Sequence, residues 1–223
     1  KTRPPLNNSI KANGIRIRHL VETASALFPD ARCELDHANV FQLAIAVILS
    51  AQATDPSVNK VTPALFERYP DPKSMAEAEL SELESMIKSI GLFRSKAKHI
   101  KALSQILTEH YDGKVPSDFT ELQKLPGIGR KTANVIVAVG FDQPGLAVDT
   151  HVLRVSKRLG LVSQSADPTQ TELILKKAIP EAQWGLAHHA ILFFGRYHCT
   201  ARNPKCDNCP LKEECPTYKK MSR

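Results

Sequence analysis

Apolar residues recur every three or four positions along most of the chain, the spacing that places them on one face of an α-helix. Segments with this spacing predict helices at 17–28, 56–69, 95–111, 132–139, 149–159, 169–179 and 183–194. Residues 41–51 are apolar on nearly all sides, so this segment predicts a buried helix. No segment has a convincing strand pattern, and the expected fold class is therefore all-α.

Serines placed three positions before glutamates mark the starts of two further helices. Ser74 with Glu77, and Ser81 with Glu84, have the spacing of a capping box, in which the serine caps the helix. These pairs predict two short helices that begin at the serines. A third start is expected at 116–118, where Pro-Ser-Asp stands before a short helical segment.

The segment 95–111 divides clearly into an apolar and a polar side. Its apolar positions are Ile100, Leu103, Ile106 and Leu107. Three basic side chains fall outside this stripe and are expected to be available to solvent: Lys96, Lys98 and Lys101. The pattern predicts a long amphipathic helix.

The first 18 residues contain five lysines and arginines and no acid, together with Pro4 and Pro5. This composition predicts a loose arm over residues 1–16, either a disordered leader or a segment that contacts DNA. The whole chain has a formal charge of +7 and a pI of about 9.2, which favours a polyanionic partner such as a nucleic acid. Solvated lysines that bind nothing would give the same charge.

The composition, 42% hydrophobic and 24% charged over 223 residues, is typical of a globular protein. The longest unbroken apolar run, 43–49, is too short to cross a bilayer, and no apolar signal core follows the basic N-terminus. We therefore expect no membrane association and a reducing compartment, the cytoplasm of a bacterium or archaeon.

Four of the five cysteines cluster near the C-terminus in the spacing C-x6-C-x2-C-x5-C: Cys199, Cys206, Cys209 and Cys215. In a reducing compartment such a cluster indicates metal ligands rather than disulfides. Four thiolates suit a tetrahedral zinc ion or a [4Fe–4S] cluster, and the lack of paired short knuckles favours iron–sulfur without deciding it. Cys33 stands alone and is expected to be a structural thiol.

The segment 125–151 holds the candidate chemistry. It begins Leu-Pro-Gly-Ile-Gly-Arg-Lys, where two glycines in a hairpin between helices leave backbone N–H groups uncovered. A helix that starts just after the hairpin directs its positive end at an approaching anion. Lys131 falls in the first turn of that helix, and Asp149 opens the next one. A phosphate cradle, an amine and a carboxylate indicate chemistry on a nucleic acid, although a solvated Lys131 and a plain N-cap at Asp149 are the ordinary alternatives.

At these residues the chain resembles the endonuclease III family of helix–hairpin–helix DNA glycosylases. Besides the four-cysteine spacing, the resemblance rests on five collinear motifs: 49–55 (LSAQATD), 90–97 (IGLFRSKA), 125–133 (LPGIGRKTA), 148–155 (VDTHVLRV) and 195–199 (GRYHC). It extends from about residue 17 over nearly the whole chain.

The resemblance implies two helical domains that flank a DNA-binding cleft. A six-helix barrel domain would occupy residues 33–143, with the hairpin motif at its end. The second domain would combine residues 1–32 with 144–223 and would hold the cysteine loop. The resemblance, rather than the spacing, also selects a [4Fe–4S] cluster over zinc.

The family's activity implies roles for two residues. A bifunctional DNA glycosylase/AP lyase removes oxidised pyrimidines from duplex DNA and nicks the strand by β-elimination. Lys131 would be the nucleophile that forms a Schiff base with the sugar, and Asp149 would stabilise the cationic transition state and assist proton transfer. His151, two positions after Asp149, is expected to be structural, and His188, His189 and Trp184 are expected to pack.

The resemblance implies a second group of residues that bind DNA. Gln52 would fill the gap left by the flipped base, and Leu92 would be an apolar wedge at the opposite strand, with an ordinary core leucine as its alternative. The hairpin would hold one DNA phosphate through Gly127, Ile128, Gly129 and the adjacent Arg130. The expected partner is double-stranded DNA with an oxidised pyrimidine or an abasic site, bound by a monomer at the nucleoid.

Two alternatives stay open on the sequence. The first is a mismatch adenine or thymine glycosylase of the same superfamily, against which Lys131 argues because those members generally lack this lysine. The second is a helix–hairpin–helix DNA-binding module that has no enzymatic activity and carries a structural metal.

Overall fold

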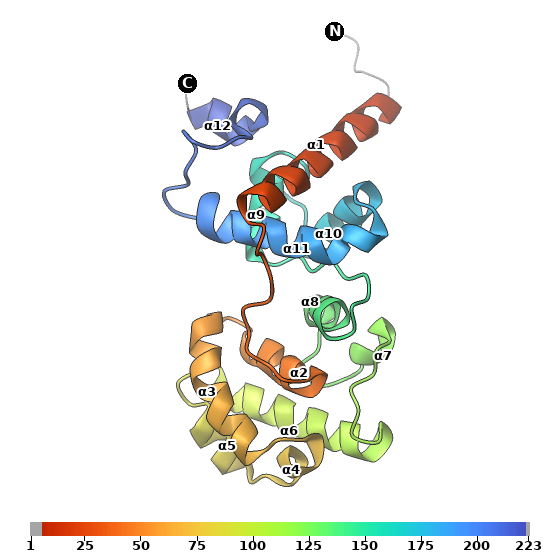
Figure 1. Ribbon diagram of the computed structural model, residues 1–223, viewed down its shortest axis with the longest axis vertical. Coiled ribbons are helices and arrows are strands. Elements are labelled where there is room, and N and C mark those ends of the chain that lie inside the picture. The colour runs from red at the N-terminus through yellow and green to blue at the C-terminus, as the bar shows by residue number, and fades with distance from the viewer. Residues whose placement is uncertain (1–5, 222–223) are drawn as a thin grey trace. The chain divides into compact units, whose positions relative to one another are not determined.

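The computed structural model describes residues 6–221, and every regular element in this range is a helix (Figure 1). No strand occurs among the described residues, so the all-α fold class is confirmed. Within the same range, no helix is both long and apolar enough to cross a membrane.

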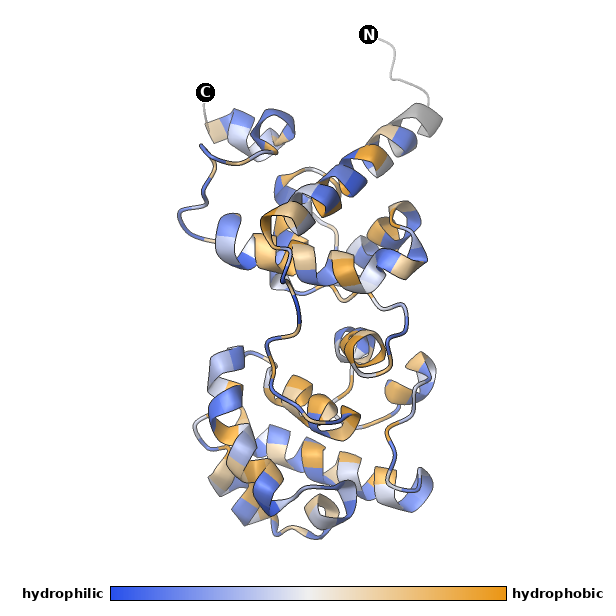
Figure 2. Cartoon of the chain, viewed as in Figure 1, coloured by the Kyte–Doolittle hydropathy of each residue, from blue (hydrophilic) through white to orange (hydrophobic). Residues whose placement is uncertain are grey.

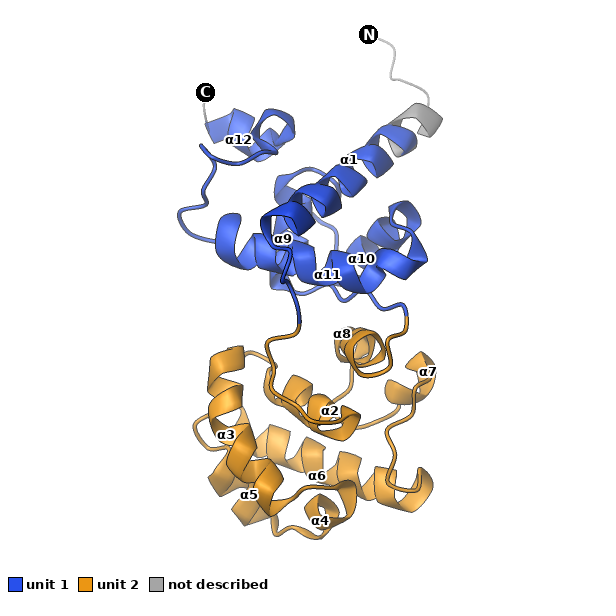
Figure 3. Ribbon diagram, in the orientation of Figure 1, with its two compact units in different colours: residues 1–32, 144–223 blue, residues 33–143 orange. Residues whose placement is uncertain are grey.

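The chain divides into two compact units (Figure 3). Residues 33–143 form the central unit, and residues 1–32 together with 144–223 form the terminal unit. The same residue numbers bound the two domains that the family resemblance implies.

The central unit contains the helices α2 (Val40–Leu49), α3 (Asp55–Arg68), α4 (Pro72–Glu77), α5 (Leu80–Met86), α6 (Phe93–His110), α7 (Phe119–Leu122) and α8 (Arg130–Val135). Helix α8 continues as a π-helical turn at Ile136–Gly140. The unit has one helix more than the six implied by the resemblance if the four-residue α7 is counted.

Helix α2 lies at the core of the central unit. Residues 43–49 are all buried, because α2 packs against α3, α6, α8 and the π-helical turn. Figure 2 shows the same helix as almost continuously hydrophobic. Its start is fixed by Asn39, whose side chain accepts a hydrogen bond from the Gln42 N–H at 2.9 Å.

Two helix starts and one lysine of this unit differ from the sequence prediction. Helix α4 is capped by Asp71 and not by Ser74, which instead occupies the N3 position of an Asp71–Ser74 capping box. Helix α5 follows Glu79 without a side-chain cap, so Ser81 is not its cap either. Lys96 is 4% exposed and not solvent-facing, because α6 packs against α2, α4 and α5 and so is covered over more than one stripe.

The terminal unit contains α1 (Leu6–Leu27), α9 (Thr150–Arg158), α10 (Pro168–Ala178), α11 (Trp184–Phe193) and α12 (Pro216–Met221). Helix α1 packs against α10 and α11, and α11 also contacts α9. Their apolar faces form one core that includes Leu20, Val152, Leu175 and Phe194. A π-helical turn at Phe194–His198 continues α11 to the first clustered cysteine.

The prediction of a loose arm is wrong for residues 6–16, which form the first half of α1. The amide of Asn13 donates to the Leu161 carbonyl at 3.0 Å, and the Arg16 guanidinium donates to the Leu159 carbonyl. These contacts with distant residues favour a helix that the local composition does not predict. The first five residues of the predicted arm lie outside the described part of the chain.

Candidate functional site

The hairpin between α7 and α8 is built around a left-handed glycine. Gly127 has φ +79°, a conformation that a residue with a Cβ rarely adopts. A Cβ added there would lie 3.1 Å from His99 Cβ and 3.3 Å from two side-chain carbons of Ile48. The hairpin is thus held closely against α2 and α6, and the protein itself requires this glycine.

Ile128 and Gly129 follow Gly127 and connect the hairpin to α8. The Ile128 N–H donates to the Leu125 carbonyl at 3.1 Å, and the Ile128 side chain is buried. Gly129 caps α8 in an extended conformation, and a Cβ there would meet no atom of the described chain within 4 Å. Within residues 6–221, the N–H groups of Gly127 and Gly129 have no hydrogen-bond acceptor.

Lys131 is the second residue of α8, and its side chain is exposed. It makes no hydrogen bond or ion pair with any described residue. The neighbouring Arg130 guanidinium lies over the Phe119 ring, 5.4 Å from its centroid. The structure therefore places an unengaged amine directly after the hairpin.

Gln52 and Leu92 are both exposed on the central unit, in turns that lie next to each other. Both have left-handed backbone conformations, with φ +54° at Gln52 and +59° at Leu92. A Cβ added to Gly91 would be 3.9 Å from the Gln52 carbonyl oxygen. Leu92 is 59% exposed, so the alternative of a core leucine is wrong.

Asp149 belongs to the terminal unit and caps α9. Its Oδ1 accepts a hydrogen bond from the Val152 N–H at 2.8 Å, as expected of a plain N-cap. His151 lies 3.3 Å from an Arg154 nitrogen, and burial lowers its pKa although the Asp149 charge acts in the opposite direction. His188 is buried with its Nδ1 2.8 Å from the Ala147 carbonyl, which fits the packing role expected for it.

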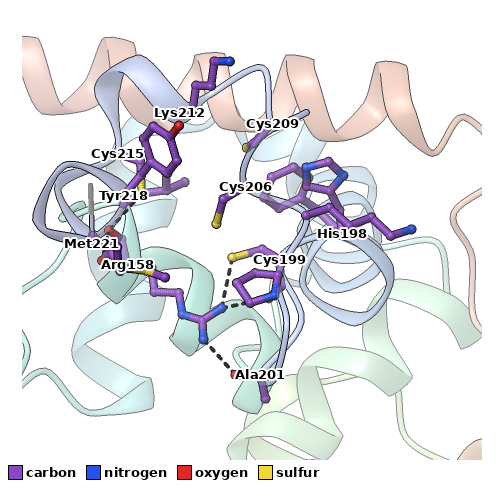
Figure 4. Close-up of a pocket in the computed structure, with 15 residues that line it drawn as sticks. Arg158, His198, Cys199, Ala201, Cys206, Cys209, Lys212, Cys215, Tyr218 and Met221 are labelled. Carbon is purple, nitrogen blue, oxygen red and sulfur yellow. Dashed lines mark hydrogen bonds between the residues drawn. The ribbon is translucent and has the colours of Figure 1, made fainter. Parts of the chain in front are cut away.

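The four clustered cysteines line one cavity of about 230 Å³ in the terminal unit (Figure 4). Four thiols around one cavity supply the all-cysteine ligand set that a [4Fe–4S] cluster requires, and a zinc ion could use the same set.

Helix α9 holds the cysteine loop in place through two arginines. Arg158 donates to the Cys199 sulfur at 3.4 Å and to the Ala201 carbonyl at 3.0 Å (Figure 4). It also donates to the Thr200 carbonyl at 2.7 Å. Arg154 donates to the Gly195 carbonyl at 2.6 Å and to the Cys199 carbonyl at 3.1 Å. The sequence prediction included neither arginine, because an i, i+4 pair of arginines is common on helix surfaces and does not by itself indicate a contact with the loop.

Two of the four thiols have raised pKa values. Burial raises the pKa of the Cys206 and Cys209 thiols, and repulsion from the neighbouring Cys199 and Cys215 adds to this. Because iron binds the thiolate, filling the site releases protons.

Comparison with known proteins decides the family. Residues 45–181 match the family model described as HhH-GPD superfamily base excision DNA repair protein, and residues 199–215 match the iron–sulfur binding domain of endonuclease III. Endonuclease III of Bacillus subtilis is 48% identical over 93% of this chain and 95% of its own length. The chain belongs to the endonuclease III family. Endonuclease III of Escherichia coli is 41% identical over 86% of the chain and 91% of its own length.

Solved structures agree with this assignment. A trapped endonuclease III–DNA covalent intermediate has a TM-score of 0.92 and 51% identity, and it covers 94% of this chain and 99% of its own. A thermostable thymine-DNA glycosylase shares the fold with a TM-score of 0.84 at 23% identity.

Membership of the endonuclease III family establishes the general activity. The protein is a DNA glycosylase with AP lyase activity that acts in base excision repair on damaged DNA. The alternative of a binding module without enzymatic activity is therefore wrong. The C-terminal segment is the family's iron–sulfur domain, and its cofactor is a [4Fe–4S] cluster.

Loss of the cluster is expected to destabilise the terminal unit. In Cys209→Ser, the crosslink that closes segment 199–215 is weakened, and closing a loop of this size contributes about 3 kcal/mol through chain entropy. Thermal unfolding followed by circular dichroism, with visible absorbance as the measure of cluster content, tests this. Cys33→Ser, outside the loop, is the matched control and should keep the absorbance. Equal stability of loaded and cluster-free protein would contradict the prediction.

Proposed function

We propose that this endonuclease III relative removes oxidised pyrimidines from duplex DNA and cleaves the resulting strand by β-elimination, with Lys131 as the nucleophile. The observation that carries the proposal is the unengaged, exposed amine of Lys131 directly after the hairpin. Capture of a 51% identical endonuclease III as a covalent intermediate with DNA supports a nucleophilic mechanism.

The Lys131 amine takes part in both stages of the proposed reaction, release of the base and cleavage of the strand. Lys131 Nζ attacks the sugar C1′, the C1′–N bond to the base breaks, and the base departs with the electron pair. The secondary ammonium formed at C1′ loses one proton, and the C1′–O4′ bond then breaks as O4′ takes up a proton. The nitrogen keeps its other proton and forms the C1′=N bond of a protonated Schiff base. Removal of a 2′ proton breaks the bond from C3′ to the phosphate oxygen and nicks the strand.

Asp149 is proposed to act at the same sugar. Its carboxylate would stabilise the positive charge that develops at C1′ and would accept a proton from the attacking amine. Only its Oδ1 has a capping bond with Val152 among the hydrogen bonds of the described residues, so we propose Oδ2 as the atom that faces the sugar.

The hairpin is proposed to bind one DNA phosphate. The N–H groups of Gly127 and Gly129 are the proposed donors, with Arg130 beside them; the Ile128 N–H already bonds to Leu125. Such contacts position the DNA without reading its sequence. Because no described residue crowds a Cβ at Gly129, a glycine there suits a closely approaching phosphate.

Two glycine substitutions should separate folding from DNA binding. Gly127→Ala is expected to lower the free energy of unfolding by about 1–2 kcal/mol, because φ is +79° and the Cβ would be crowded by His99 and Ile48. Gly129→Ala should fold normally yet bind duplex DNA about tenfold more weakly. Chemical unfolding and fluorescence anisotropy measure the two effects. Wild-type affinity in Gly129→Ala would count against the phosphate contact.

Gln52 and Leu92 are proposed to occupy the space that the damaged base leaves. Both side chains are exposed on adjacent turns, so they are placed to enter DNA together. Insertion of side chains offsets part of the stacking that is lost when a base is flipped out.

Cys199, Cys206, Cys209 and Cys215 are proposed to hold the [4Fe–4S] cluster, and its role is proposed to be structural. When bound, the cluster supplies a crosslink between the two ends of the cysteine loop. We further propose that the protein acts as a monomer on nucleoid DNA; the two endonuclease III relatives named above are bacterial.

Borohydride trapping tests the proposed activity. The protein is mixed with duplex DNA that carries one oxidised thymine, one abasic site or no lesion, and borohydride reduces any Schiff base to a stable adduct. We expect adducts with the first two duplexes only. Base release without an adduct would indicate a glycosylase that lacks lyase activity, and adducts on the abasic duplex alone would exclude oxidised thymine as a substrate.

A further inference from the structure

The side chain of Lys96 is the buried charge of the central unit that the proposed chemistry leaves unused. Its Nζ donates to the Leu49 carbonyl at 2.8 Å. Among the described residues Lys96 has no acidic partner, and burial lowers its pKa. A buried ammonium without a counter-charge is costly, so packing alone does not account for it.

The Leu49 carbonyl that accepts this hydrogen bond belongs to the last residue of α2. The last four carbonyls of a helix need partners from outside its own ladder. Three of these carbonyls in α2 accept hydrogen bonds from residues just after the helix. Ser50 donates to the carbonyls of Ala46 and Val47, and Ala51 donates to the carbonyl of Ile48. The fourth, Leu49, accepts from Lys96, 47 positions away in the sequence.

Lys96 also bonds to the second exposed turn. Its backbone N–H donates to the Leu92 carbonyl at 3.0 Å, and Leu92 is the left-handed residue that precedes α6. Gln52, the left-handed residue of the other turn, follows three positions after Leu49. One residue therefore binds the end of α2 through its side chain and the start of α6 through its backbone.

We propose that Lys96 is a positioning residue that holds the Gln52 and Leu92 turns in register for insertion into the DNA stack. The inference rests on the DNA-inserting roles proposed for those two residues. Non-glycine residues with positive φ are strained and persist only when their surroundings fix them. Without the Lys96 bond, the α2 end would relax, and the two side chains would enter DNA less effectively.

Lys101 provides a matched control on the same helix. Its Nζ donates to the carbonyls of Ala76, at 2.9 Å, and of Ala78, at the end of α4. Lys101→Met thus removes the same kind of lysine-to-carbonyl bond from α6 without touching either turn.

The experiment compares two single-turnover rates within each protein. One is base release from an intact duplex with an oxidised thymine, which requires opening the stack. The other is strand cleavage at a preformed abasic site opposite a one-nucleotide gap, which does not. The ratio of the rates is independent of the fraction of folded protein, so partial unfolding of a variant does not obscure the result.

Lys96→Met is expected to lower the duplex rate about tenfold and to leave the gapped rate within twofold. Lys101→Met should keep the wild-type ratio, and Lys96→Arg, which retains a donor, should recover most of it. A 2-aminopurine opposite the lesion should report reduced unstacking with Lys96→Met at saturating protein. A wild-type ratio, or an equal fall in both rates, would overturn the proposal.

Gln52→Ala separates this inference from the function on which it rests. If Gln52→Ala lowers the duplex rate and Lys96→Met does not, only the role of Lys96 is overturned. If Gln52→Ala also retains the wild-type ratio, the inserting role of Gln52 fails, and the inference for Lys96 fails with it.

Discussion

Replacing Lys131 by alanine is expected to abolish covalent trapping and to slow strand cleavage by about 10³-fold or more, because in the proposed mechanism its amine is the nucleophile. The side chain is exposed and makes no bond within the described residues, so the thermal stability should stay at the wild-type value. Single-turnover cleavage of an abasic duplex, with borohydride trapping in parallel, measures the loss.

Two variants separate chemistry from electrostatics at this position. Lys131→Arg keeps a positive charge but cannot form a Schiff base at neutral pH, so it should bind DNA normally and fail to trap. Lys98→Ala removes an exposed lysine of α6 and serves as the control for loss of charge alone. A covalent adduct formed by Lys131→Ala at the wild-type rate would place the nucleophile elsewhere.

Much of the fold followed from local sequence patterns. The spacing of apolar residues located α6, α9, α10 and α11 to within a few residues, because each helix buries one face against its own unit. The first half of α1 could not be located in this way. Its helical state depends on bonds from Asn13 and Arg16 to residues of the α9 end, which a local pattern does not contain.

The spacing of apolar residues also did not predict which residues on the polar side of a helix are buried. Lys96 and Lys98 are two positions apart outside the apolar stripe of α6, yet Lys96 is buried and Lys98 exposed. The difference arises because the Leu49 carbonyl, at the end of α2, accepts a hydrogen bond from Lys96 and not from Lys98. Hydrogen bonds of this kind depend on which helices pack against each other, and the spacing of apolar residues along the sequence does not reveal that packing.

The candidate site was predictable where a motif encodes backbone geometry. A glycine at 127 is demanded by a positive φ and by close neighbours, and the cysteine spacing alone indicated a metal centre. The hydrogen bonds of Arg154 and Arg158 to the loop were not predictable, since any helix surface carries such arginines. The choice between a cluster and one zinc ion, which the spacing left open, comes from the match to the family's iron–sulfur domain.

Replacing Asp149 by asparagine is expected to lower single-turnover base release by at least about 10²-fold without loss of stability. Asparagine caps helices as well as aspartate does, so the bond to the Val152 N–H survives while the negative charge is lost. Asp149→Ala should lose both, with about 1 kcal/mol less stability than wild type. Comparing the two variants therefore isolates the charge from the cap.

Asp167 supplies the matched control, because it caps α10 in the same unit through a 2.7 Å bond from the Gln170 N–H. Asp167→Ala should lose a similar amount of stability and retain the full rate of base release. If Asp149→Asn also retained the full rate, Asp149 would be a helix cap and nothing more. A rate that falls in Asp149→Asn at unchanged stability comes from loss of the carboxylate, with its charge and its capacity to accept a proton, since cap and fold are then both intact.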